Sequence, residues 1–268
     1  MSSRAEGPEG ELTSSGGAVK SADRLMTLLE HLADTGEATF SAIAAALKMP
    51  NSSAHQLLRT AHRRGFVEFD ESTRTYRLGL RLWEVAQSFA GNLDLPGTAQ
   101  PLMTALSDET GETVQLARLD GLENVYLAIA ESKQPMKLVS TVGARLPAHT
   151  TGVGKVLLSG LTEEQLGTRL EGATLERFTR NTLTSIPDLL VELRRIRKQG
   201  YGEDNEEYVV GCRCVAMAVR GGNGVAVAAM SVSIPTPRFN RTIARDVRLA
   251  LTRTVAEVER RLGGRTAS

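Results

Sequence analysis

The chain of 268 residues lacks the features of a membrane or secreted protein. It contains no apolar run near the ~18–20 residues that cross a bilayer, which excludes a membrane-spanning helix. Residues 1–18 include no apolar segment of the kind that a secretory signal needs. They are rich in Ser, Gly and Glu, and this composition predicts a disordered tail. We therefore expect a cytoplasmic protein with no membrane contact.

Cysteine is scarce, because only Cys212 and Cys214 occur. One residue separates them on an expected strand, so their side chains project from the same face in a poor geometry for a disulfide. Two unpaired cysteines favour a reducing compartment. A zinc site shared with His149 would need a fourth ligand, and a Cys–His hydrolase would need a group that orients His149. The sequence indicates neither, so we expect no metal, no cofactor and no enzyme activity.

The net charge is only +1, so the overall charge balance does not indicate a nucleic-acid partner. The local distribution does, because residues 38–67 contain no Asp or Glu but include Lys48, Arg59, Arg63 and Arg64. A basic stripe within a neutral protein fits contact with DNA phosphates. The alternative is an ordinary solvated helix face, and charge alone does not separate the two.

The same region has the element order of a winged helix-turn-helix. Leucines at i, i+3, i+4 and i+7 predict a helix over residues 21–35. A short helix capped by Ser41 and a third helix follow, separated by a proline-containing turn. Two β-like runs, 66–69 and 75–78, flank a polar turn and predict a hairpin wing. This order predicts a DNA-binding domain at residues 19–79.

One face of the third helix has the chemistry of a groove reader. At 100° per residue, its polar and basic side chains fall opposite an apolar stripe that includes Ala54 and Leu58. Hydroxyls, an amide able to read adenine, and guanidiniums able to bind guanine or phosphate suit the major groove. Arginines of the wing would add backbone or minor-groove contacts. The residues predicted to contact double-stranded operator DNA are Ser52, Ser53, Gln56, Arg59, Arg63, Arg74 and Arg77.

An α+β domain is expected after a linker helix over residues 80–95. The linker helix carries exposed apolar residues around Trp83, which predicts either packing on the second domain or dimerisation. The second domain, residues 96–265, combines helices with antiparallel strands and has no internal repeat. Its expected strands include 113–119, 124–129 and 136–142, and its expected helices include 101–110, 162–170 and 242–262.

The most informative stretch of the second domain is a hairpin around Gly221-Gly222-Asn223-Gly224. A two-residue turn at its centre pairs Cys214 with Ser231 and Cys212 with Ser233, all on one face of the sheet. Small thiols and hydroxyls gathered on one face could line a ligand cavity. They could equally fill a tight helix–sheet interface, and the pattern alone leaves both open.

The segment TTGVGK, residues 150–155, is not a nucleotide phosphate loop. That motif requires Gly where the chain has His149, and Ser or Thr where it has Val156. A short Gly-rich loop that leads into a helix still offers backbone N–H groups to an anion. A small carboxylate is the expected guest.

Three sequence blocks together resemble the IclR family of bacterial regulators over residues 19–264. They are SAIAAALKMPNSSAHQLLRTAHRRGFV with the YRLG that ends the wing, GARLPAHTTGVGKVLLSGL, and GYGEDNEEYVVGCRCVAMAV followed by VAAMSVSIP. The resemblance implies a winged helix-turn-helix, a linker helix and a GAF-like α/β effector-binding domain. It also implies a homodimer, possibly assembled into a homotetramer, that switches transcription when a small organic acid binds. The effector-binding positions that it implies are Gly152, Val153, Asp204, Cys214, Ser231 and Ser233.

The chain departs from the usual family pattern at two places. The family commonly has Lys, Ser, Thr and Arg at the start of the recognition helix, where this chain has Asn51, Ser52, Ser53 and Gln56. The operator sequence of relatives therefore does not transfer to this chain. Ala148 replaces a bulkier apolar residue, which favours a larger acid, aromatic rather than two-carbon. The leading prediction is a regulator of a catabolic operon, and the alternative is a small-molecule sensor or enzyme whose N-terminal helices contact protein.

Overall fold

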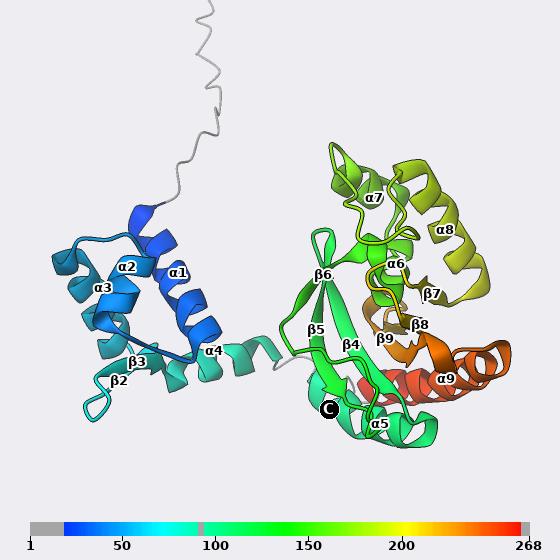
Figure 1. Ribbon diagram of the computed structural model, residues 1–268, viewed down its shortest axis with the longest axis horizontal. Helices are drawn as coiled ribbons and strands as arrows, with labels where there is room; N and C mark the ends of the chain where they lie inside the picture. The colour runs from blue at the N-terminus through cyan, green and yellow to red at the C-terminus, as the bar shows by residue number, and fades with distance from the viewer. Residues whose placement is uncertain (1–18, 91–93, 264–268) are drawn as a thin grey trace, which may run out of the picture. The chain divides into compact units, whose positions relative to one another are not determined.

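The computed structural model describes residues 19–90 and 94–263, and the expected tail lies outside them. The chain divides into two compact units between residues 92 and 93, and Figure 1 shows the elements of each. Within the described residues, none of the helices combines the length and the apolar character that a bilayer crossing requires.

The N-terminal unit is a winged helix-turn-helix, as the sequence predicted. Its antiparallel strands run in the order β1-β3-β2. Three helices bury a core that includes Leu28, Ile43 and Leu58. The elements are α1 (Lys20–Thr35), β1 (Glu37–Thr39), α2 (Phe40–Ala46), α3 (Asn51–Arg63), β2 (Val67–Asp70), β3 (Thr75–Leu78) and α4 (Leu80–Ala90).

The start of α2 differs from the prediction by two residues. The expected cap was Ser41, but Thr39 caps the helix, because its Oγ1 accepts the backbone N–H of Ala42 at 3.4 Å. Both hydroxyls can cap, and β1 ends at Thr39, so the chain can enter the helix there. Helix α3 begins at Asn51, as predicted.

Helix α4 follows the wing directly. The expected linker helix extended to residue 95, but residues 91–93 lie outside the described part, and Leu95 begins the next helix, α5. Among the described side chains of α4, three large apolar ones are exposed: Leu80 at 63%, Trp83 at 61% and Val85 at 47%. Such exposure is expected of a helix that meets a partner.

The C-terminal unit is an α+β domain with a six-stranded antiparallel sheet in the order β6-β5-β4-β9-β8-β7. Helices α5 and α9 pack on one face, and α6 packs on the other with α7 and α8 (Figure 1). The elements are α5 (Leu95–Thr110), β4 (Thr113–Asp120), β5 (Glu123–Ala130), β6 (Arg145–Pro147), α6 (Gly152–Ser159), α7 (Glu163–Leu170), α8 (Ile186–Gln199), β7 (Gly202–Asn205), β8 (Cys212–Arg220), β9 (Ala226–Pro235) and α9 (Arg241–Gly263), with 3₁₀ turns η1 (Ala148–Thr150) and η2 (Thr236–Arg238).

The expected strand over 136–142 is wrong, because this segment does not join the sheet. Side chains hold it instead of a backbone ladder. The Thr113 hydroxyl donates to the Leu138 carbonyl at 3.2 Å, and the Gln115 amide donates to the Ser140 hydroxyl at 2.8 Å. The segment therefore crosses the sheet as a loop.

The register of the β8–β9 hairpin is two residues away from the prediction. Cys214 pairs with Ser233 rather than with Ser231, which pairs with Ala216. The turn has three residues rather than two, because the Gly221 N–H donates to the Val225 carbonyl at 2.9 Å and encloses residues 222–224. Gly224, the last of the three, has a left-handed φ of 76°. A bulge beside Val219 adds the second step. Because the shift is even, each residue keeps its predicted face.

Candidate functional site

The exposed face of α3 carries the residues predicted to contact DNA. Ser52, Gln56, Arg59 and Arg63 are exposed, and Ser53 is half-buried. The opposite face is buried against the core through three apolar residues, which are Ala54, Leu58 and Ala61. The helix therefore presents hydroxyl, amide and guanidinium groups together without using any of them for packing.

The wing presents its two arginines differently. Arg74 is exposed at the turn between β2 and β3, with a positive φ of 54°. Arg77 forms an ion pair with Glu68 across the hairpin, with Nη2 and Oε2 3.0 Å apart. A DNA phosphate would therefore have to displace Glu68 from Arg77. Among the described residues, it would meet no such competing carboxylate at the predicted DNA-contacting side chains of α3.

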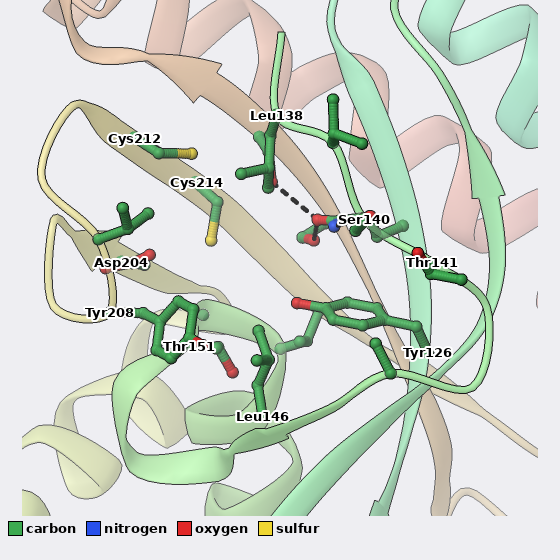
Figure 2. Close-up of a pocket in the computed structure, with 18 residues that line it drawn as sticks. Tyr126, Leu138, Ser140, Thr141, Leu146, Thr151, Asp204, Tyr208, Cys212 and Cys214 are labelled. Atoms are coloured by element: carbon green, nitrogen blue, oxygen red, sulfur yellow. Dashed lines mark hydrogen bonds between the residues drawn. The ribbon is translucent and has the colours of Figure 1, made fainter. Parts of the chain in front are cut away.

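The second group of predicted residues lines one cavity of about 390 Å³ (Figure 2). Its walls come from all six strands of the sheet, the start of α6, the 136–142 segment and the loop after β7. The sequence missed several lining residues, among them Gln115, Tyr126 and Tyr208. The predicted residues that line the cavity are Gly152, Val153, Asp204, Cys214, Ser231 and Ser233.

Gly152 starts α6 where the backbone lies close to the sheet. A Cβ at this position would lie 2.5 Å from Cys214 Sγ and 3.3 Å from the Ala216 Cβ, so only glycine fits. Thr151 caps the helix by accepting the Gly154 N–H at 3.0 Å. Its hydroxyl donates in turn to Asn124 Oδ1 at 2.6 Å. The N-terminus of α6 is thereby fixed at the cavity wall.

Ala148 does not line this cavity. It is fully buried and packs under α6, where a Cβ on Gly154 would lie 2.4 Å from the Ala148 Cα. The backbones of Ala148 and Gly154 can therefore lie in close contact. Ala148 thus acts on the loop that leads into α6 rather than on the ligand directly, and the inference from Ala148 to a larger acid stays a prediction.

A buried glutamine organises the polar wall of the cavity. The Ser233 hydroxyl donates to Gln115 Oε1 at 2.8 Å, and the Ser231 hydroxyl points to the same oxygen at 3.5 Å. The Gln115 amide donates to Ser140 at 2.8 Å. One sequence signal could have revealed this: Gln115 is a polar residue between the apolar Val114 and Leu116 in the expected strand 113–119. The sequence-based role of the two serines as free donors is thus too simple.

Asp204 is a buried carboxyl in the cavity wall, only 7% exposed. Burial raises its pKa to about 7, while the Glu207 backbone N–H, which it accepts at 2.7 Å, opposes that rise. The nearby Glu207 charge raises the pKa further. Asp204 therefore titrates near neutral pH and can act there as either a hydrogen-bond donor or an acceptor. Burial likewise raises the pKa of Cys214 well above its usual range.

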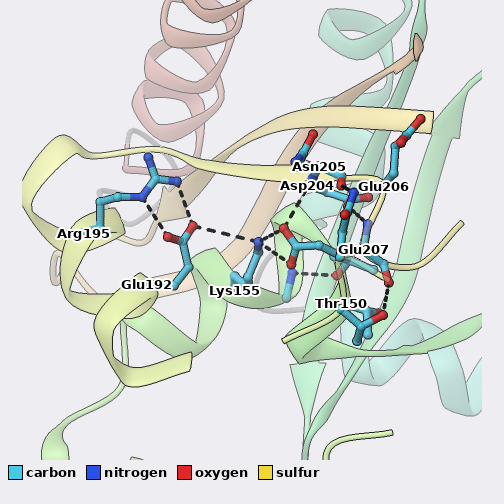
Figure 3. Close-up of polar contacts among 12 residues, drawn as sticks. Thr150, Lys155, Glu192, Arg195, Asp204, Asn205, Glu206 and Glu207 are labelled. Carbon is cyan, nitrogen blue, oxygen red and sulfur yellow. Dashed lines mark hydrogen bonds and ion pairs between the residues drawn. The ribbon is translucent and has the colours of Figure 1, made fainter. Parts of the chain in front are cut away.

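A buried ion pair fixes the acidic run 203–207, in which Asp204 lies on β7 and Glu207 follows the strand (Figure 3). Lys155 Nζ lies 2.5 and 2.6 Å from the two carboxylate oxygens of Glu207 and 3.9 Å from Glu192. The exposed fraction is 1% for the Lys155 side chain and 8% for that of Glu207. The acidic run 203–207 predicts either a solvated loop or one carboxylate that lines a pocket. The structure buries Asp204 and Glu207 together.

The arrangement gives no support to a hydrolase or a metal centre. His149 lines a different cavity from the one that Cys212 and Cys214 line, and its Nε2 lies 3.0 Å from the Glu176 carbonyl. In the part of the chain that the structure describes, no group of His, Cys, Asp or Glu is arranged to hold a metal ion.

Comparison with known proteins decides the family. Residues 21–71 match the IclR helix-turn-helix domain, and residues 87–260 match the bacterial transcriptional regulator IclR C-terminal domain. The chain belongs to the IclR family of transcriptional regulators. It is 37% identical over 218 residues to the HTH-type transcriptional repressor AllR of Salmonella typhi, a match that covers 81% of this chain and 80% of AllR.

Solved IclR-family structures share the fold over nearly the whole chain. The Thermotoga maritima IclR superposes with a TM-score of 0.73 at 30% identity, covering 91% of this chain and 97% of that one. An IclR homologue from Microbacterium hydrocarbonoxydans complexed with 4-hydroxybenzoate superposes with a TM-score of 0.79 at 25% identity, covering 90% and 98%. The IclR fold thus unites a DNA-binding unit and a ligand-binding C-terminal domain in this chain.

Proposed function

We propose that this IclR-family regulator controls a catabolic operon, with α3 in the major groove of its operator and a small organic acid in the C-terminal cavity. The proposal rests on a partly open cavity with polar and apolar walls, in the same chain as a polar face of α3 that does not pack against the core. Its volume of about 390 Å³ lies within the range of small-molecule sites, roughly 300–1,000 Å³. Tyr126 and Tyr208 in the wall favour an aromatic acid, as does the 4-hydroxybenzoate complex of the relative.

The DNA half of the proposal is tested by two substitutions on α3. Gln56→Ala removes an amide that can read adenine, so discrimination against wrong bases should fall by about 1–3 kcal/mol. Arg63→Ala removes a phosphate contact, so it should weaken all DNA sequences alike and flatten the salt dependence. Both are measured by fluorescence anisotropy on the intergenic DNA upstream of its own gene. Arg260→Ala, on α9, is the matched control. Unchanged binding in both α3 variants would contradict the groove assignment.

The cavity half is tested by removing the polar wall. Ser231 and Ser233 can turn from Gln115 to a ligand carboxylate, with help from the N–H groups at the start of α6. We expect Ser231→Ala/Ser233→Ala to weaken the best-binding acid of an aliphatic and aromatic panel by about tenfold or more in calorimetry. Ser185→Ala, at the cap of α8, is the control. Equal affinity in both variants would place the carboxylate elsewhere.

We propose further that the regulator is a homodimer, with a homotetramer built from two such dimers as the alternative assembly. Leu80 and Trp83 on α4 support a dimer, because large exposed apolar side chains of a helix next to a DNA-binding unit are covered by symmetric association. A dimer would also present two copies of α3 to a symmetric operator.

A further inference from the structure

A second hollow lies on the α9 face of the C-terminal sheet, away from the acid cavity. It is a groove of about 410 Å³ where α9 begins. Four arginines and a single glutamate line it, so its lining carries an excess of positive charge. The charged residues are Arg213, Arg241, Arg245, Arg248 and Glu203.

Aromatic rings hold two of these guanidiniums in place. The Arg213 guanidinium lies 3.8 Å from the centre of the Phe239 ring, and that of Arg248 lies 4.8 Å from the Tyr201 ring. Stacking fixes the plane of a guanidinium and leaves its edge to donate hydrogen bonds. Arg213 Nε is buried, and within the described residues it has no hydrogen-bond partner. Buried polar groups in folded proteins are rarely left unpaired, so this free donor in a positively charged groove favours an anion as the partner.

The groove and the acid cavity share one wall. Strands β7 and β8 pair Asp204 with Cys214, and both of these residues line the acid cavity. Side chains alternate along a strand, so the preceding residues, Glu203 and Arg213, lie on the other face. They line the groove. Only the thickness of the sheet separates the two.

We propose that this groove is a second regulatory site, which binds a small multiply charged anion of the phosphate-ester or polycarboxylate class. Guanidinium edges match phosphate and carboxylate oxygens through paired hydrogen bonds, and several of them together select an anion with more than one charge. The exposed ion pair of Arg245 with Asp246, 3.0 Å long, is weak enough for such an anion to displace it. Among the described residues, the acid cavity has no Lys or Arg in its wall, so it lacks the charges that would hold the same anion.

Electrostatics couples the two sites. Burial raises the pKa of Asp204, and the Arg213 charge on the other face of the sheet acts against that rise. An anion on Arg213 offsets this charge, favours protonated Asp204, and thereby favours a carboxylate in the acid cavity. Because coupling is reciprocal, the acid should strengthen anion binding by the same factor. This coupling rests on the proposed function of the acid cavity, whereas anion binding in the groove does not.

The test is calorimetry on the full-length protein with inorganic phosphate, pyrophosphate and citrate as probes. We expect saturable binding of pyrophosphate or citrate, about tenfold or more weaker in Arg241→Gln/Arg245→Gln, which removes two exposed guanidiniums of the groove. Arg253→Gln/Arg260→Gln changes the same charge farther along α9 and should bind as the unaltered protein does. The preferred probe distinguishes a phosphate-ester from a polycarboxylate ligand.

Three outcomes would overturn the site. They are the absence of saturable binding by all three probes, equal weakening in both α9 double variants, and loss of binding only in Arg59→Gln/Arg63→Gln, which would place the anion on the DNA-binding helix. A separate titration of the acid in the presence of the bound probe tests the coupling. If the groove binds the probe but acid affinity does not change, the coupling fails and the groove site stands.

Discussion

Lys155→Met is expected to lower the free energy of unfolding of the C-terminal domain by about 3–5 kcal/mol. The substitution leaves the Glu207 carboxylate buried at 8% side-chain exposure without the ammonium that lies 2.5 Å away. Methionine fills a similar volume, so little of the loss comes from a cavity. The hydrogen bond from the Asn205 N–H to Glu207 Oε1, 3.3 Å long, does not compensate a full charge. Urea denaturation of the full chain, followed by circular dichroism, measures the effect.

Two further variants separate the ion pair from simple packing. Lys155→Met/Glu207→Gln removes both charges and keeps an acceptor for the Asn205 N–H, so it should recover most of the lost stability. Lys137→Met breaks the exposed pair with Glu131 and should cost less than about 1 kcal/mol. If the double variant were as unstable as Lys155→Met, the buried charge would not be the cause.

The ion pair also has a functional position. Lys155 lies one turn after Gly152 and Val153 on α6, and Glu207 lies three residues after Asp204, just beyond the end of β7. The pair therefore ties together two walls of the acid cavity that are far apart in the chain. Loosening it should displace Asp204 and the start of α6 from each other before either element unfolds.

Local patterns predicted most of the elements because each depends on residues close in sequence. Leucine spacing marked α1, and the polar start at Asn51 marked α3. The β8–β9 register could not be read in the same way, since it depends on a three-residue loop and a bulge rather than on composition. Its faces were still correct, because an even shift preserves the alternation of side chains. The 136–142 segment is rich in apolar and β-branched residues, as strands are, but side chains of β4 hold it as a loop. The sequence does not reveal such partners.

The cavity followed the same division. The predicted small residues of the hairpin share its wall because face parity alone brings Cys214, Ser231 and Ser233 together. Other features of the cavity join residues that are far apart in the chain. Gln115 and Ser231 are 116 residues apart, and Lys155 and Glu207 are 52 residues apart. A single sequence contains no signal for which distant charges meet. The acidic run 203–207 therefore allowed either a solvated loop or one pocket carboxylate, and it did not predict the buried pair of Glu207 with Lys155.

Asp204→Asn is expected to stabilise the protein at high pH and not at low pH. A carboxyl whose pKa moves from 3.8 unfolded to about 7 folded costs roughly 4 kcal/mol of folding free energy once it is ionised. The folded state holds the proton more tightly, so the stability of the unaltered protein falls as pH rises from about 4 through 7 and then levels off. Asparagine cannot ionise and still accepts the Glu207 N–H.

The free energy of unfolding of Asp204→Asn should therefore equal that of the unaltered protein near pH 4 and exceed it by up to roughly 4 kcal/mol near pH 9. Asp246→Asn, exposed on α9, should show no such divergence. The titration of Asp204 should also affect ligand binding. If a carboxylate acid binds beside protonated Asp204, the Kd of the acid should rise about tenfold between pH 6 and pH 8. The Asp204→Asn variant should not show that rise. A pH-independent Kd together with the expected stability curves would show that Asp204 is buried and protonated as described but does not face the bound carboxylate.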